Sequence, residues 1–283
     1  MIAQAFFLDG AHGRRFCLWH VPADGTPRAA LLYLHPFAEE MNRSRRMAAL
    51  QARALAQAGY AVLQLDLFGC GDSDGEFGDA TWTQWVNDVE AGLDWITQQC
   101  AAPLWLWGLR AGCLLAVDVL PRRGDVAGLL LWQPQLSGKQ ALRQFLRIKL
   151  AEDMLAAQSG EAAGTADGDA GSNVRGRLAR GESVEIAGYA LSAGLALGFE
   201  AAELNLPSAP VRVECLEVAA GGGDALPPAV TIPLQTALAR WSAAGHAARA
   251  TAIHGVPFWQ MAEPEEVLPL LDATVRAMVE PAS

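Results

Sequence analysis

The sequence predicts an α/β fold in which helices cover both faces of a mostly parallel central sheet and a cap is inserted past the middle of the sheet. Between residues 29 and 134, short apolar stretches alternate with longer helix-like ones, which is typical of repeated strand–helix–strand units. Hydrophobic residues make up 52% of the chain and charged residues 18%, which is enough apolar material for a large core. A chain of 283 residues can form one domain with an insertion, so we expect residues 1–283 to be a single domain.

The predicted elements before the cap are a hairpin followed by alternating strands and helices. The expected strands cover residues 5–8, 16–21, 31–34, 61–66, 104–107 and 126–132, and the expected helices cover residues 45–57, 82–97 and 111–120. The first two strands are expected to pair as an antiparallel hairpin at the sheet edge. The later strands are separated by helices, which are the usual crossovers between parallel strands.

The alternation stops after Pro134, and residues 137–206 are expected to form the cap over the carboxyl edge of the sheet. This segment begins as a helix and continues as a loop rich in Gly, Ala, Asp and Ser at 158–173. It then runs through an uncharged apolar stretch at 186–199, which is too short to cross a membrane and predicts a buried or interfacial helix. The strand and helix pattern returns at 211–218, 233–243, 249–253 and 264–279, so the cap interrupts one domain.

Charge and cysteine content exclude several classes of function. The formal net charge of -10 argues against nucleic-acid binding, which needs clustered Lys and Arg. The five cysteines have no CxxC spacing, so we expect no metal site, no disulfide framework and no cofactor. Residues 1–15 do not show the basic segment and apolar run of a signal peptide, and no later stretch reaches the roughly 18 uncharged apolar residues of a membrane span. We therefore expect no transmembrane segment and a cytoplasmic location.

Three short motifs follow predicted strands, at the edge where open parallel sheets bind their ligands. They are HPFAEEMN at 35–42, DLFGCGDS at 66–73 and GLRAG at 108–112. In this order and spacing they resemble the α/β-hydrolase superfamily. The turn at His35 is similar to the family's oxyanion loop, and residues 66–73 are similar to its D-x-x-G-x-G-x-S turn. GLRAG is similar to the G-x-S-x-G elbow, with Arg110 in place of the serine.

A narrower resemblance is to the hydrolase 2 proteins associated with exosortase A systems of exopolysaccharide-producing bacteria. The HPFAEEMNRSRRM stretch that begins at His35, the GLRAG elbow and the PFWQ segment at 257–260 are similar to that family. This resemblance implies an ester or thioester hydrolase linked to exopolysaccharide and protein-sorting loci.

Arg110 at the elbow excludes the serine mechanism that the superfamily uses. An elbow serine attacks the substrate while a histidine takes its proton and backbone amides bind the oxyanion. A guanidinium stays protonated, has no acceptor atom and is neither a nucleophile nor a base. Acyl transfer through this position is therefore ruled out.

The elbow keeps the features of an anion site. The amide of Ala111 opens a helix, and an amide near Phe37 or Ala38 would face it. A cation at a helix N-terminus is unfavourable, so we expect Arg110 to pair with Glu39 or Glu40 on the neighbouring loop.

This pairing leaves three interpretations of Arg110. The arginine can fill and neutralise a pocket that is no longer used, or it can bind a substrate carboxylate or phosphate. In the third interpretation Glu39 or Glu40 activates water while Arg110 polarises an ester or thioester carbonyl.

The other two residues of a catalytic triad have only weak candidates. The superfamily's histidine lies after the last strand, and here His254 precedes a glycine while Pro257 precedes the aromatic pair, so His254 can either reach the pocket or cap the strand end. Glu217 and Asp224 both follow the 211–218 strand as candidate acids. Cys113 is expected to be a buried hydrophobic residue rather than a replacement nucleophile.

Two hypotheses of function follow. The first is a hydrolase or transferase that acts on an ester or thioester, with Arg110, Glu39, Glu40 and His254 as catalytic candidates and His35, Phe37, Ala38 and Ala111 as substrate-binding candidates. The second is a non-catalytic relative that binds a small anionic or acyl ligand, or a partner protein, in the former active site. A homodimer is compatible with either hypothesis.

Overall fold

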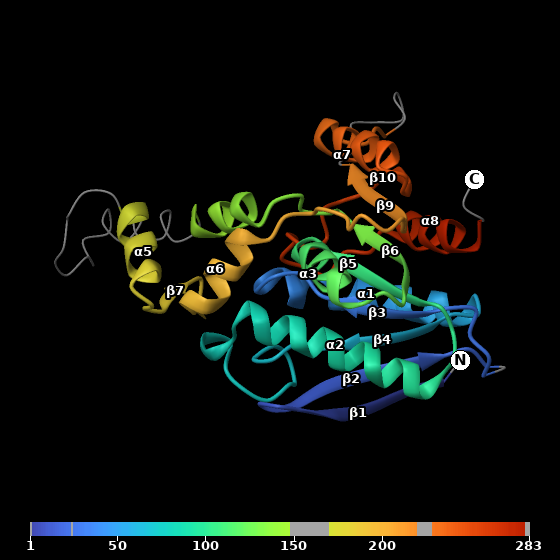
Figure 1. Cartoon of the computed structure of the whole chain (residues 1–283), viewed down its shortest axis with the longest axis horizontal. Helices are drawn as coiled ribbons and strands as arrows, with labels where there is room; N and C mark the ends of the chain where they lie inside the picture. Colours follow the sequence, from blue (N-terminus) through green and yellow to red (C-terminus); the bar gives the residue numbers. More distant parts are fainter. Residues whose placement is uncertain (1, 24, 148–169, 220–227, 281–283) are drawn as a thin grey trace.

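The computed structural model describes residues 2–23, 25–147, 170–219 and 228–280. Its centre is an eight-stranded sheet with the strand order β1-β2-β4-β3-β5-β6-β9-β10 (Figure 1). The strands are β1 (Ile2–Gly10), β2 (Gly13–Val21), β3 (Ala30–Leu34), β4 (Ala61–Leu65), β5 (Leu104–Leu109), β6 (Val126–Trp132), β9 (Arg212–Ala219) and β10 (Ala247–His254). The β1–β2 hairpin pairs antiparallel to β4, and every later neighbour in the sheet is parallel. The predicted α/β-hydrolase fold with a mostly parallel sheet is confirmed.

Helices cover both faces of this sheet. On one face lie α2 (Trp82–Gln99), α3 (Ala111–Val119) and α7 (Ile232–Ala243), and on the other lie α1 (Glu39–Gln57) and α8 (Leu268–Val279). Short 3-10 turns, η1 (Phe77–Asp79) and η2 (Leu120–Arg122), lead into α2 and out of α3. Among the helices that the structure describes, none combines the length and apolar character needed to cross a bilayer.

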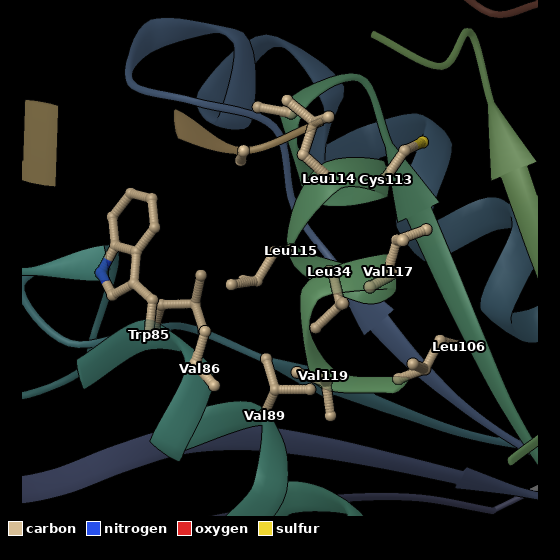
Figure 2. Close-up of a cluster of buried hydrophobic side chains, with 14 of the residues drawn as sticks. Leu34, Trp85, Val86, Val89, Leu106, Cys113, Leu114, Leu115, Val117 and Val119 are labelled. Carbon is tan, nitrogen blue, oxygen red and sulfur yellow. The ribbon is translucent and has the colours of Figure 1, made fainter. Parts of the chain in front are cut away.

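Apolar packing between α2, α3 and the central strands fixes the elbow. Val86 and Val89 of α2 meet Leu115 and Val119 of α3 above the sheet, and all four are nearly inaccessible to solvent (Figure 2). Fully burying one such aliphatic side chain contributes roughly 1.5–3 kcal/mol. This packing holds α3, whose first turn begins the functional site, against α2 and the sheet.

The segment inserted between β6 and β9, which we call the cap, extends from one side of the sheet (Figure 1). The described part contains a helical segment at 138–147, then α5 (Ala170–Ala179), a hairpin of β7 (Val184–Ile186) and β8 (Tyr189–Leu191), and α6 (Ala193–Ala201). Most of the predicted loop at 158–173 lies outside the described residues, and its last four residues begin α5.

The prediction of one helix at 186–199 is wrong. Ala187 and Gly188 both adopt positive φ angles, 50° and 79°, and form the turn of the β7–β8 hairpin. Ser192 then caps α6, and its side-chain oxygen accepts a hydrogen bond from the Leu195 amide at 3.0 Å. Because the stretch carries no charged residue, its sequence pattern did not reveal the turn at 187–188 or the start of α6 at Ala193.

Candidate functional site

The elbow joins β5 to α3 through Arg110, which has φ 55° and ψ -115°. This backbone conformation is strained for a residue with a side chain and is often found at functional sites. The flanking glycines make it possible: a Cβ on Gly108 would lie 2.6 Å from the Cys113 nitrogen, and a Cβ on Gly112 would lie 2.1 Å from the Leu34 carbonyl oxygen. The two glycines of GLRAG are therefore required by the close approach of strand and helix.

A second strained residue stands at the start of α1. Ala38 has φ 50° and ψ -128° and is the N-cap of that helix. The helix begins at Glu39 rather than at residue 45, so Glu39 and Glu40 belong to its first turn and not to a loop, which corrects the expectation. Carboxylates in the first turn of a helix are stabilised by the helix dipole.

Arg110 and Glu40 form an ion pair across the gap between α3 and α1. The Arg110 Nη2 donates to Glu40 Oε1 at 3.0 Å, and the Arg110 Nε lies 3.3 Å from both carboxylate oxygens. The side chain of Arg110 is 14% exposed and that of Glu40 is 24% exposed. The carboxylate thus compensates the cation that the α3 N-terminus would otherwise disfavour.

Glu39 takes a different partner and connects α1 to the cap. The Tyr189 hydroxyl donates to its Oε2 at 2.9 Å, and the Asn42 amide donates to the same oxygen at 3.2 Å. The Tyr189 hydrogen bond is the main reason why the pKa of Glu39 lies below its usual value, with smaller effects from Asn42 and Arg43. The ionised form of Glu39 therefore holds the β7–β8 hairpin against α1.

This arrangement predicts the effect of Tyr189→Phe. Loss of the hydroxyl should raise the pKa of Glu39 toward its ordinary value, because the charged form loses its strongest hydrogen bond. The Glu39–Tyr189 contact should likewise weaken as the pH falls through the pKa of Glu39. A carbon-13 NMR titration of the glutamate carboxyls measures this, with Tyr60→Phe, whose hydroxyl donates to Met278 instead, as the matched control. A Glu39 pKa unchanged in Tyr189→Phe would contradict the assigned cause.

Trp259 covers Arg110 from the opposite side. The Arg110 Cζ lies 5.4 Å from the centre of the Trp259 ring, within the range of a cation–π contact. The loop that carries Trp259 is fixed to α1, because Arg43 donates to the Gln260 carbonyl at 2.6 Å. Sequence reasoning did not assign Trp259 to the site, although the PFWQ segment was available as a signal.

A cavity of about 580 Å³ lies above the ion pair. Its charged lining groups are Glu39, Glu40, Arg43 and Arg110, and most of the remaining wall is aromatic or aliphatic. Phe37 stacks on Phe199 of the cap with ring centres 4.8 Å apart and meets Phe145 edge-on at 5.1 Å. Of the predicted substrate-binding residues, Phe37 and Ala38 line this cavity, whereas Ala111 is buried at the start of α3 and is not among its lining residues.

A smaller cavity of about 180 Å³ adjoins it and has a different character. Its lining includes the side chains Ser137, Gln140, Glu217 and Thr231. Glu217 is buried and accepts hydrogen bonds from the Thr231 amide at 2.7 Å and from the Thr231 hydroxyl at 2.8 Å. The candidate acid therefore caps the start of α7, while Asp224 lies outside the described residues.

His254 does not join the site, which corrects its assignment as a catalytic candidate. It is the last residue of β10, where it pairs with Ala219 of β9, and its side chain is exposed and lines neither cavity. The parallel ladder thus continues to the histidine, and the loop that follows brings Trp259 over the elbow instead.

His35 also lies outside the main cavity, contrary to its prediction as a substrate-binding residue. Its Nε2 accepts from the Leu67 amide at 3.4 Å, so its Nδ1 carries the proton and donates to the Pro36 carbonyl at 2.8 Å. Burial lowers the pKa of His35, which keeps the ring neutral. The ring faces a separate cavity of about 200 Å³ that also contains Arg45 and Asp66.

The motif at 66–73 supports the chain without lining the main cavity. The Asp66 Oδ2 accepts from the Asp72 amide at 3.1 Å and from Arg45 Nη2 at 3.0 Å.

Cys70 and Cys113 are buried, and burial raises the pKa of both thiols well above the usual value. Neither sulfur is available as a thiolate nucleophile near neutral pH.

Comparison with known proteins agrees with this architecture. The family model described as Hydrolase_4, serine aminopeptidase S33, matches residues 25–195. Est1E from Butyrivibrio proteoclasticus with bound ferulic acid is similar in structure, with a TM-score of 0.67, 15% identity, and coverage of 97% of this chain and 98% of Est1E. XC6422 from Xanthomonas campestris, an α/β serine hydrolase without a lid, has a TM-score of 0.56 and 14% identity over 98% of this chain and 93% of its own. No curated protein sequence matches the chain.

Proposed function

Because this chain belongs to the serine aminopeptidase S33 family of α/β-hydrolases, we propose that it binds an ester or thioester in the cavity above Arg110 and forms no acyl-enzyme at the elbow. The Arg110–Glu40 ion pair carries the proposal. It occupies the position from which a serine would attack, and it leaves a cavity of about 580 Å³ open above it. That size lies within the range of roughly 300–1,000 Å³ that is usual for small-molecule sites.

The lining supports an acyl or aromatic acyl group as the occupant. Phe37, Phe145 and Phe199 present ring faces and edges to one part of the cavity, and apolar groups gain free energy when they leave water for such a surface. The ferulic acid in Est1E is an aromatic acid bound within the same fold. We place the carbonyl of the ligand next to Arg110, because its guanidinium is the charged hydrogen-bond donor that lines the cavity at the elbow.

A second candidate is hydrolysis without a covalent intermediate, and the placement of Glu40 favours it. Among the described residues, Glu40 Oε2 accepts one hydrogen bond, from Arg110 Nε at 3.3 Å, and the carboxylate lines the cavity. In this reaction Glu40 takes a proton from water while the water oxygen attacks the carbonyl carbon. Arg110 stabilises the negative oxygen that develops, and the alcohol or thiol leaves with the proton.

The narrower sequence resemblance suggests the biological setting. We propose a cytoplasmic role at an exosortase-linked exopolysaccharide locus, supported by the HPFAEEMNRSRRM, GLRAG and PFWQ segments. Deletion of the gene should reduce secreted exopolysaccharide, and a copy carrying Ala141→Phe, which fills the cavity, should not restore it. Normal secretion in the deletion strain would remove this part of the proposal.

Calorimetry with methyl octanoate tests binding, and mass spectrometry of released octanoate tests hydrolysis. The wild-type protein should bind the ester, Ala141→Phe should abolish binding by filling the cavity, and Ala101→Phe on the exposed surface should not change it. Binding without octanoate release supports the first candidate. Release that disappears in Glu40→Gln supports the second, and no binding at all overturns both.

Restoring the serine should not restore the family's reaction. We expect Arg110→Ser to hydrolyse nitrophenyl octanoate no faster than a protein-free control, because His254 lies outside the cavity and Trp259 covers the elbow. A spectrophotometric assay of nitrophenolate release measures the rate. Turnover that is lost again in Arg110→Ser/His254→Ala would show that His254 reaches the elbow.

A further inference from the structure

A separate cavity of about 200 Å³ lies between α1 and the strands β2, β3 and β4, and we call it the hairpin cavity because β2 belongs to the β1–β2 hairpin. Arg45 and Ala48 of α1 line it, whereas Glu40 and Arg43 of the same helix line the main cavity. No described residue lines both. The hairpin cavity is therefore distinct from the site at the elbow and uses a different face of α1.

Most of the wall of the hairpin cavity is apolar. Phe16 and Leu18 of β2 are half-buried and line it, and the small side chains of Ala48 and Ala49 line it from α1. Met41 adds a thioether, a group that makes favourable contacts with aromatic rings. A cavity of roughly 150 Å³ is large enough to hold benzene. The hairpin cavity, at about 200 Å³, has room for a ring with a short substituent.

Two polar groups in this cavity lack a hydrogen-bond partner among the described residues. Tyr33 is only 5% exposed, and its hydroxyl makes no hydrogen bond with any of them. Gln64 accepts from His20 Nε2 at 3.0 Å, which leaves its amide nitrogen without an acceptor. Neither atom is sealed from solvent, in contrast to the unpartnered indole nitrogen of Trp107. Tyr33 and Gln64 pair in register on neighbouring strands, so their side chains lie on the same face of the sheet.

The charges in the hairpin cavity compensate each other. Arg45 Nη2 donates to Asp66 Oδ2 at 3.0 Å, and these two are the ionised side chains among the described residues that line it. Burial raises the pKa of Tyr33 and lowers the pKa of His35, so both rings stay neutral near pH 7. An ion that entered would lose its hydration without gaining an unpaired opposite charge, which favours an uncharged occupant.

We propose that the hairpin cavity binds a small uncharged aromatic molecule that carries one hydroxyl or carbonyl oxygen. The ring lies against Phe16, Leu18 and Met41. The oxygen accepts a hydrogen bond from the Tyr33 hydroxyl, with the Gln64 amide nitrogen as a neighbouring donor. The ligand thus gives these donors an acceptor that the described residues do not supply. This site does not depend on ester binding in the main cavity.

NMR of carbon-13-labelled methionine methyl groups locates the binding of acetophenone and benzyl alcohol. At least one of these probes should shift the signal of Met41 and leave that of Met278, which does not line the cavity, unchanged. Ala49→Phe should abolish the shift by filling the cavity, and Ala54→Phe, at a half-buried position of α1 outside the cavity, should keep it. Ala141→Phe, which fills the main cavity, should keep it as well.

Tyr33→Phe tests the recognition of the oxygen. The variant should bind the oxygen-bearing probes about tenfold more weakly than the wild type, because their oxygen loses its donor. Ethylbenzene, which has no oxygen, should bind both proteins equally, and benzoate, which is charged, should bind the wild type more weakly than acetophenone. Tyr60→Phe is the matched control, because the Tyr60 hydroxyl donates to the Met278 carbonyl, and it should keep the wild-type affinities.

The proposal is overturned if neither oxygen-bearing probe shifts Met41, if the shift persists in folded Ala49→Phe, or if it is lost in Ala141→Phe. It is also overturned if benzoate binds more tightly than acetophenone, or if Tyr33→Phe weakens ethylbenzene as much as the other probes. Urea denaturation establishes that each variant is folded. Should Ala49→Phe not fold, the affinities of Tyr33→Phe decide the question. None of these results depends on ester binding in the main cavity, so the two proposals can fail separately.

Discussion

Gly112→Ala should lower the free energy of unfolding by about 3 kcal/mol, because the added methyl group would occupy the position of a backbone atom. Its carbon would lie 2.1 Å from the carbonyl oxygen of Leu34, and neither β3 nor the first turn of α3 can move without disturbing the core between them. Urea denaturation measures the change. Gly124→Ala, where nothing lies within 4 Å of the added carbon, should be nearly neutral. Equal stability of both variants would show that the elbow is not closely packed.

Arg110→Ala should lower the free energy of unfolding by about 2 kcal/mol. The substitution leaves Glu40 without its ionic partner and removes the contact with Trp259. Breaking a fully buried pair typically has a larger effect, about 3–5 kcal/mol, and the partial exposure of both side chains reduces it here.

A double-mutant cycle with Glu40→Ala isolates the interaction between the two side chains. The double variant should be more stable than the sum of the single changes predicts, because no unpaired carboxylate remains. Additive changes, or an unchanged melting temperature in Arg110→Ala, would mean that the ion pair does not contribute to the stability of the fold. A lysine ammonium cannot reproduce the several N–H donors that the Arg110 guanidinium offers to the Glu40 carboxylate. Arg110→Lys should therefore recover only part of the free energy of unfolding that Arg110→Ala loses.

The sheet was predictable because each strand carries its own signal. The strand at 126–132 has the predicted ends, and the predicted strand at 104–107 extends by two residues to Leu109. The start of α1 was not predictable from capping rules, because its N-cap is Ala38 in a strained conformation rather than Ser, Thr, Asp or Asn. Helix α1 is joined to the elbow through the Arg110–Glu40 ion pair, a tertiary contact that the local sequence does not contain.

The site was only partly predictable for a similar reason. Charge and neighbouring strand ends predicted that Arg110 pairs with Glu39 or Glu40, but not which of the two, and the structure pairs it with Glu40. The positions of Trp259 and His254 depend on where β10 ends and on how the next loop turns. A single sequence fixes neither of these.

The insertion of the cap between β6 and β9 also has consequences for how the chain folds and diversifies. Roughly eighty residues separate the two strands, yet doubling or halving a loop changes its closure entropy by only about 0.6 kcal/mol. The parallel pairing of β6 with β9 joins distant parts of the chain, and non-local contacts of this kind slow folding. The same arithmetic lets this segment lengthen, shorten or be exchanged in evolution with little thermodynamic effect on the sheet, so selection can vary the upper wall of the cavity while the elbow stays the same.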